Sequence, residues 1–175
     1  MFFSKLAKQT QPIWIFCDGG AGEVITLGER SQEAGKETGR RTAKVTLQAG
    51  CGAVARNDQG EILQWTWRTL SPMTNNEAEY AGLLLGVELA MHMRLRNIVC
   101  VLDSSVVVLQ MQGRAAVNSP SLRTWHRKAV DAIRPFDKVE FRLIPRELNY
   151  LADSLTWQAR QPWQVTKEWL MVNGE

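Results

Sequence analysis

The chain has 175 residues, of which 45% are hydrophobic and 22% are charged. These proportions are typical of one globular domain and exclude a disordered chain. No apolar run approaches the roughly 20 residues that a membrane span needs, and the N-terminal residues are too short and too charged a stretch for a signal peptide. We therefore expect a cytoplasmic protein. The formal charge of +3 permits a polyanionic partner without requiring one.

The first part of the chain predicts three strands. Residues 12–18 are apolar and rich in β-branched and aromatic side chains, which predicts a buried strand that glycines 19, 20 and 22 end. Residues 23–42 carry charges of both signs with little periodicity, which predicts an inserted loop with a short extra strand at 24–27. Residues 44–57 and 61–70 predict two strands, joined by a turn at 57–60.

The second part predicts helices alternating with strands. Thr74 and Glu77 have the spacing of a capping box, and the helix that they open is expected to run to about residue 93, with an apolar stripe made by Tyr80, Leu83, Leu84, Val87 and Met91. We then expect a strand at 97–102, helices at 104–112 and 120–134, a strand at 138–144 and a helix at 149–160. The tail at 161–175 is unassigned. This order predicts a mixed five-stranded sheet in which the last two strands lie parallel to the first.

Two further expectations concern the interior. The three cysteines, Cys17, Cys51 and Cys100, lack the spacing of metal ligands, so we expect buried, reduced thiols. Five tryptophans are expected in the core rather than on a base-stacking surface: Trp14, Trp65, Trp67, Trp125 and Trp157.

Four acidic residues lie where a predicted strand ends or where a helix presents one face: Asp18, Glu79, Asp103 and Asp153. Carboxylates brought to one place from separate elements repel each other unless cations lie between them. Such a group suits hard, oxygen-preferring ions such as Mg²⁺ or Mn²⁺. Taken singly, Asp18 could be a turn residue, Asp103 a helix N-cap, and the other two solvated helix residues.

The motifs around these acids resemble one family. Asp-Gly-Gly occurs at 18–20, Thr-Asn-Asn-x-x-Glu at 74–79, Asp-Ser at 103–104 and Pro-Arg-Glu-x-Asn-x-x-Ala-Asp-x-Leu at 145–155. This set resembles type 1 ribonuclease H, in particular its archaeal-type or reverse-transcriptase-like branch, over residues 12–160. The resemblance implies a single α/β domain over residues 1–175 with the ribonuclease H-like fold, strand order 3-2-1-4-5 and helices on both faces of the sheet.

The resemblance also implies the chemistry. Its catalytic, metal-binding acids correspond to Asp18, Glu79, Asp103 and Asp153, and Asn-Asn-x-x-Glu selects Glu79 rather than Glu77. The implied reaction is endonucleolytic hydrolysis of the RNA strand of an RNA–DNA hybrid to 5′-phosphate products, with two Mg²⁺ ions for which Mn²⁺ would substitute.

Substrate contacts follow from the same resemblance. Asn75 and Asn76 correspond to asparagines that touch the RNA strand, and their amides can both donate to and accept from a 2′-hydroxyl. Gly19 and Ser104 flank two of the acids, and the Arg146 guanidinium could bind a phosphate. Arg123, Arg127 and Lys128, at helical spacing, could form a small duplex-binding face or could simply be solvated.

The chain departs from better-known bacterial members in three ways. Residues 23–42 replace a short phosphate-gripping loop, Ser105 stands where a glutamine is frequent, and no histidine lies between Val139 and Asp153. Two alternatives remain open: another metal-dependent nuclease or strand-transferase on this fold, and a non-catalytic nucleic-acid-binding domain. Double-stranded RNA is a further possible substrate, and a monomer is expected.

Overall fold

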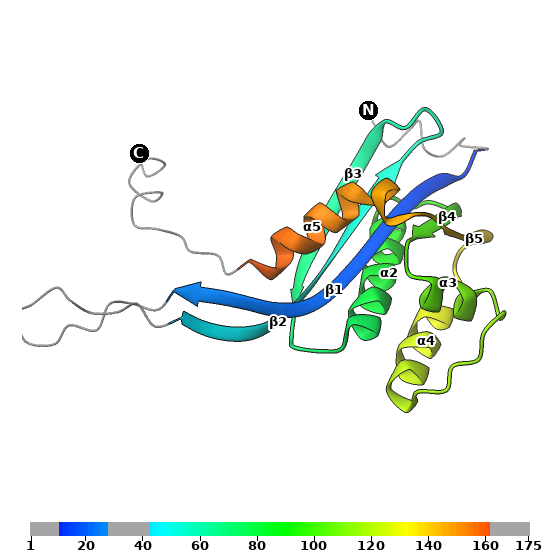
Figure 1. Cartoon of the computed structure of the whole chain (residues 1–175). Helices are drawn as coiled ribbons and strands as arrows, with labels where there is room; N and C mark the ends of the chain where they lie inside the picture. The colour runs from blue at the N-terminus through cyan, green and yellow to red at the C-terminus, as the bar shows by residue number, and fades with distance from the viewer. Residues whose placement is uncertain (1–10, 28–42, 162–175) are drawn as a thin grey trace, which may run out of the picture.

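A computed structural model describes residues 11–27 and 43–161 of the chain (Figure 1). Five strands form one mixed sheet: β1 (Ile13–Leu27), β2 (Ala43–Arg56), β3 (Ile62–Leu70), β4 (Asn97–Leu102) and β5 (Lys138–Leu143). The strand order is β3-β2-β1-β4-β5. The first three strands are antiparallel neighbours, whereas β4 lies parallel to β1 and β5 parallel to β4. The predicted sheet, including its order, is confirmed.

Helices cover both faces of this sheet, as predicted. α2 (Asn75–His92) lies behind β1 and β2 in Figure 1, on the same side as α3 (Ser105–Met111) and α4 (Pro120–Ala132). α5 (Tyr150–Arg160) crosses the front of the sheet over β1, β2 and β3, and a short 3₁₀ helix, η1 (Arg146–Leu148), precedes it. No helix in residues 11–27 and 43–161 is long and apolar enough to cross a membrane.

The course of β1 differs from the prediction. The strand does not end at its glycines but continues to Leu27, and it stays paired with β2 as far as Leu27 opposite Ala43. The strand predicted at 24–27 is present, but it is the end of β1 and not a separate strand. Residues 28–42 of the predicted loop lie outside the described part of the chain. Glycine breaks a strand when its backbone leaves the ladder, but here the missing side chains instead make room for helices. Since β1 continues, Asp18 lies in the middle of a strand, not at its end.

The core lies between α2 and the sheet. Ile13, Ile15 and Cys17 of β1 pack with α2 side chains such as Leu83 and Val87, and all of them are buried. Gly86 lets α2 approach closely, because a Cβ there would overlap the Cys17 sulfur. The three cysteines are buried and unpaired, as expected.

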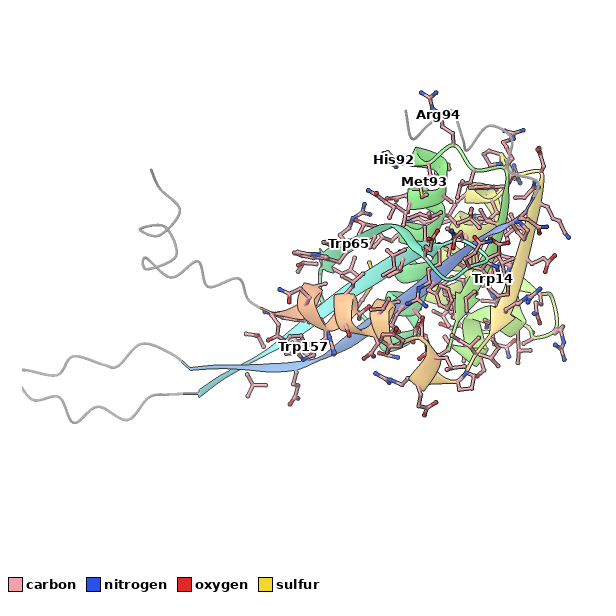
Figure 2. The ribbon with its side chains drawn as sticks, turned by 90° about the horizontal axis from the view of Figure 1, so that it is seen from above. Trp14, Trp65, His92, Met93, Arg94 and Trp157 are labelled. Atoms are coloured by element: carbon pink, nitrogen blue, oxygen red, sulfur yellow. The ribbon has the colours of Figure 1, made fainter. Side chains whose placement is uncertain are left out.

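Three side chains expected in the core lie at the surface. Trp65 on β3 and Trp157 on α5 are each 56% exposed (Figure 2), and Met91 of the predicted apolar stripe is 42% exposed. α5 buries its small residues, Ala152 and Ala159, against β2, and this leaves Trp157 on its outer side. Burial here follows from how closely two elements pack, and a large side chain is excluded from the closest contact.

Candidate active site

Asp18 projects from the sheet face that α5 covers. Residues of β1 alternate between the two faces, so Ile15 and Cys17 point into the α2 core while Asp18 and Gly20 face α5. Only 5% of Asp18 is exposed. Burial raises the pKa of its carboxyl to about 6, with the buried hydroxyl of Thr156 acting in the opposite direction and the charge of Asp103 adding to the increase.

Glu79 comes from the first turns of α2. The helix begins with the predicted capping box: the Thr74 hydroxyl accepts from the Glu77 amide, and the Glu77 carboxylate accepts from the Thr74 amide. Glu77 is thereby held at the cap, whereas Glu79 is directed inward and is 9% exposed. The sequence-based choice of Glu79 over Glu77 agrees with this geometry.

Two glycines bring α2 against β1 at this point. A Cβ on Gly19 would overlap the carbonyl oxygen of Ala78, and a Cβ on Gly82 would overlap the carbonyl oxygen of Asp18. No side chain fits in either place, so the backbones of α2 and β1 are in direct contact. This contact sets how close Glu79 comes to Asp18.

Asp103 follows the last residue of β4. Its predicted structural alternative, a helix N-cap, does not hold, because the neighbouring Ser104 is the N-cap of α3 and its hydroxyl accepts from the Val107 amide. Asp103 instead accepts a hydrogen bond of 2.9 Å from the Asn149 side chain.

Asn149 is a residue of the site that sequence reasoning missed. Its side-chain NH₂ donates both to Asp103 and, at 2.9 Å, to the carbonyl oxygen of Cys17 in β1, and the residue is 1% exposed. It therefore ties β1, the end of β4 and the start of α5 together. The signal was present in the motif at 145–155, where Asn149 stands between the arginine and the acid.

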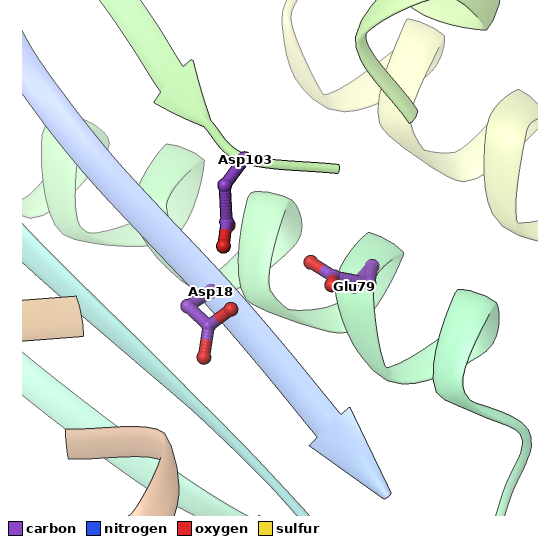
Figure 3. A group of neighbouring side chains, drawn as sticks. All are labelled: Asp18, Glu79 and Asp103. Carbon is purple, nitrogen blue, oxygen red and sulfur yellow. The ribbon is translucent and has the colours of Figure 1, made fainter. Parts of the chain in front are cut away.

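Asp18, Glu79 and Asp103 converge (Figure 3). Each offers an oxygen within 4.8 Å of the other two. Burial, followed by the charges of Asp18 and Asp103, raises the pKa of Glu79 to about 8. Three carboxylates at this spacing disfavour full ionisation unless a cation neutralises them.

The donor set fits hard divalent cations. All three groups offer carboxylate oxygens, which are the ligands preferred by Mg²⁺ and Mn²⁺. One Glu79 oxygen, Oε2, is also buried without a hydrogen-bond partner among the described residues. A buried carboxylate oxygen without a partner is costly, and a metal ion would supply the missing interaction.

Asp153 lies beside this group but outside it. It is in the first turn of α5, where its charge contributes to the raised pKa of Asp18. Its carboxylate is paired with Arg146 at 2.6 Å. The structure thus places the fourth predicted acid next to the other three, with Arg146 as its partner.

The remaining predicted contacts are arranged around the N-terminus of α2 and on α4. The side-chain oxygen of Asn75 accepts from the Ala21 amide at 3.2 Å, while Asn76 is exposed. Exposed positions on α4 hold Arg123, Arg127 and Lys128. Arg123 donates to the carbonyl oxygen of Val117, and the Lys128 ammonium lies 5.0 Å from the Trp125 ring centre.

A mixed sheet of this order, with one acid on its central strand, one after the neighbouring parallel strand and one on the helix α2 packed against it, defines the ribonuclease H-like fold class. A family model described as "Reverse transcriptase-like" matches residues 39–159. The chain belongs to this family. The resemblance to type 1 ribonuclease H stated from the motifs is confirmed.

Two curated proteins are similar to this chain in sequence. The bifunctional protein Rv2228c of Mycobacterium tuberculosis is 33% identical over 108 residues, which are 61% of this chain and 30% of the relative. Ribonuclease HI of Halobacterium salinarum is 32% identical over 111 residues, which are 63% of this chain and 56% of the relative. The chain thus spans about a third of the first relative and just over half of the second.

Solved structures agree in fold. The N-terminal RNase H domain of Rv2228c, solved as a fusion with maltose-binding protein, has a TM-score of 0.69 at 27% identity and covers 86% of this chain and 94% of that one. LC11-RNase H1 in complex with an RNA/DNA hybrid has a TM-score of 0.65 at 28% identity and covers 85% and 96%.

Proposed function

We propose that this chain is an endoribonuclease that hydrolyses the RNA strand of RNA–DNA hybrids and leaves 5′-phosphate products. The observation that carries the proposal is the convergence of Asp18, Glu79 and Asp103 within 4.8 Å of one another. It is supported by similarity to Ribonuclease HI and to an RNase H1 solved with an RNA/DNA hybrid.

Mg²⁺ is the cofactor that we assign to this site, with Mn²⁺ as a substitute. Asp18, Glu79 and Asp103 would hold it, and Asp153 would join them as the fourth acid. When bound, such ions activate water and neutralise the charge that develops on the leaving oxygen. Asp18, on the central strand β1, is the acid that we expect the ions to share.

The chain's own residues would recognise the RNA strand. Asn75 is fixed to β1 through its side-chain oxygen, so its NH₂ group is the part that would face a 2′-hydroxyl, with Asn76 beside it. Gly19 and Ser104 border the acids on either side. Arg146 would exchange its contact with Asp153 for one with a phosphate.

More distant contacts and the protein's context are also part of the proposal. Arg123, Arg127 and Lys128 on α4 would contact the duplex backbone outside the site. The domain would act as a monomer in the cytoplasm, and double-stranded RNA would be a secondary substrate.

A cleavage assay with three duplexes tests this function. The wild-type chain, Asp103→Asn and a control, Asp58→Asn, are offered an RNA–DNA hybrid, double-stranded RNA and double-stranded DNA, with Mg²⁺ or EDTA. Asp58 is exposed in the β2–β3 turn, so its variant should match the wild type. We expect Mg²⁺-dependent cutting of the hybrid, lost in Asp103→Asn while circular dichroism shows an unchanged fold.

Other outcomes assign other functions. Equal inactivity of wild type and Asp103→Asn on the hybrid, with binding retained, would overturn the catalytic proposal in favour of a binding domain. Cutting of double-stranded DNA in preference to the hybrid would instead indicate another nuclease of this fold.

A further inference from the structure

Arg160, in the last turn of α5, has a guanidinium without a partner among the described residues. Its Nε is buried and lacks a hydrogen-bond acceptor, and no carboxylate within residues 11–27 and 43–161 pairs with it. Taking a cationic donor out of water without an acceptor is unfavourable. A guanidinium held in this way is suited to an anion supplied from outside, since its fork geometry matches a phosphate.

The guanidinium of Arg160 lies against the backbone of β1 at Gly20 and Gly22, where no side chain intervenes. A Cβ on Gly22 would lie 3.3 Å from Arg160 Nη1, and a Cβ on Gly20 would lie 3.7 Å from Arg160 Cζ. Any side chain longer than alanine at these two positions would occupy the space of the guanidinium. Gly20 and Gly22 therefore leave the space in which the Arg160 side chain lies against β1.

This place lies next to the acidic site. Gly20 is two residues after Asp18 and so faces the same side of β1. Arg160 is two helical turns after Asp153, about 10 Å along the axis of α5. Each strand of a duplex carries one phosphate per about 3.4 Å of the duplex axis, so a strand bound at the acids can bring another of its phosphates to Arg160.

Charge also singles out Arg160. Arg146, whose charge acts on Asp18 and Glu79, pairs with Asp153 and has to give up that pair before it can contact a phosphate. A polyanion that approaches Asp18, Glu79 and Asp103 is repelled by them, and a cation that has no carboxylate partner can bind it without first breaking an ion pair. Among the described residues of α5 and β1, Arg160 is such a cation.

We propose that Arg160, which lies against Gly20 and Gly22, binds a backbone phosphate of the nucleic-acid substrate beside the acids. This inference rests on the proposed function, and it names a contact that fixes where the strand lies along β1. Arg160 binds substrate and takes no part in bond cleavage.

The salt dependence of hybrid binding tests the proposal. The full chain carrying Asp103→Asn, to prevent cleavage, is compared with the same chain carrying Arg160→Gln in addition, by fluorescence anisotropy with a labelled RNA–DNA hybrid over a series of salt concentrations. Loss of one phosphate contact should reduce the slope of log K against log salt by about one and weaken binding about eightfold at about 0.1 M salt. Arg160→Lys should retain the slope.

A matched control removes an arginine elsewhere. Arg96→Gln deletes a guanidinium that pairs with Asp137 at the opposite end of β4, and the slope should stay unchanged. In the chain with Asp103 intact, Arg160→Gln should raise KM for the hybrid with kcat little changed, because the contact is made before and during the reaction alike.

Several results would overturn the inference. An unchanged salt slope in Arg160→Gln would do so, and so would weaker binding accompanied by a lower melting temperature but the same slope, since that pattern indicates a structural role. Should Arg160→Gln fail to fold, Gly22→Val would displace the guanidinium from β1, and binding equal to the parent chain would refute the proposal. Absence of binding by the parent chain would instead refute the proposed function together with it.

Discussion

Replacing Glu79 by glutamine is expected to stabilise the metal-free protein, and to do so more as the pH rises. The folded protein raises the pKa of this carboxyl from 4.5 to about 8. In the unfolded chain the group ionises near 4.5, so the unfolded state loses its proton first. The Glu79 contribution to stability is thus fully present below pH 4.5 and is lost as the pH rises towards 8.

The size of this stability change follows from the interval between the pKa values of Glu79 in the unfolded and folded states. One pH unit between the two pKa values changes the free energy of unfolding by about 1.4 kcal/mol. Between about pH 5 and 7 the ionisation of Glu79 should lower the free energy of unfolding of the wild type by about 2–3 kcal/mol. The Glu79→Gln variant has no proton to lose at this position, and the side-chain oxygen of the new amide can still accept from the Gly19 amide. The raised pKa of Asp18 acts in both proteins and cancels to first order in their difference.

Urea denaturation in EDTA over the range from about pH 5 to about pH 8 measures this difference. Glu77→Gln is the matched control, because the Thr74 amide and hydroxyl lower the pKa of Glu77. Its carboxylate is ionised in both states over this range, so its difference from wild type should be constant. A Glu79→Gln difference that does not change across the range would refute the reasoning. Added Mg²⁺ should then stabilise wild type more than Glu79→Gln.

Three further outcomes follow from the site. Asn149→Ala removes the donor to Asp103 and to β1 and should lower the free energy of unfolding by about 1–3 kcal/mol; a change below about 0.5 kcal/mol in urea denaturation would contradict that role. Gly82→Ala should destabilise by more than about 2 kcal/mol, because its Cβ would overlap the Asp18 carbonyl; a native melting temperature would refute this contact. Glu77→Ala should cost about 1 kcal/mol through the lost cap and leave hybrid cleavage unchanged, whereas loss of cleavage would implicate Glu77 in the site.

Local signals account for what the sequence predicted well. The capping box at Thr74 and Glu77 depends on residues three positions apart, and it determined the start of α2 and the inward direction of Glu79. Asp103 was found because an apolar run of strand length ends just before it. Such features are determined by the nearest neighbours in the chain, so they can be read without the rest of the fold.

Contacts between distant elements account for what it did not predict. From the sequence alone the glycines of β1 are interpreted as strand breakers. Their role in allowing close packing is visible only when their contacts with α2 and α5 are known. Trp157 is hydrophobic, yet its exposure depends on which side of α5 meets β2. The contacts of Asn149 span 132 and 46 residues of sequence. In each case the deciding partner lies far away in the chain, and hydrophobic periodicity carries no information about it.

The glycines also explain how the acids can be held so close together. Carboxylates that repel one another move apart if their side chains or elements are free to do so. Here Gly19 and Gly82 place the backbones of β1 and α2 in direct contact, and Asn149 fixes the end of β4 to β1. The elements that carry the acids are therefore held together by contacts between backbones. A change of side-chain conformation cannot move these elements apart and so cannot relieve the repulsion. Repulsion remains in the metal-free protein and contributes to the raised pKa of Glu79, and a bound cation would remove it. A site built in this way is organised before its cation arrives, so cation binding should require little movement of β1, α2 or β4.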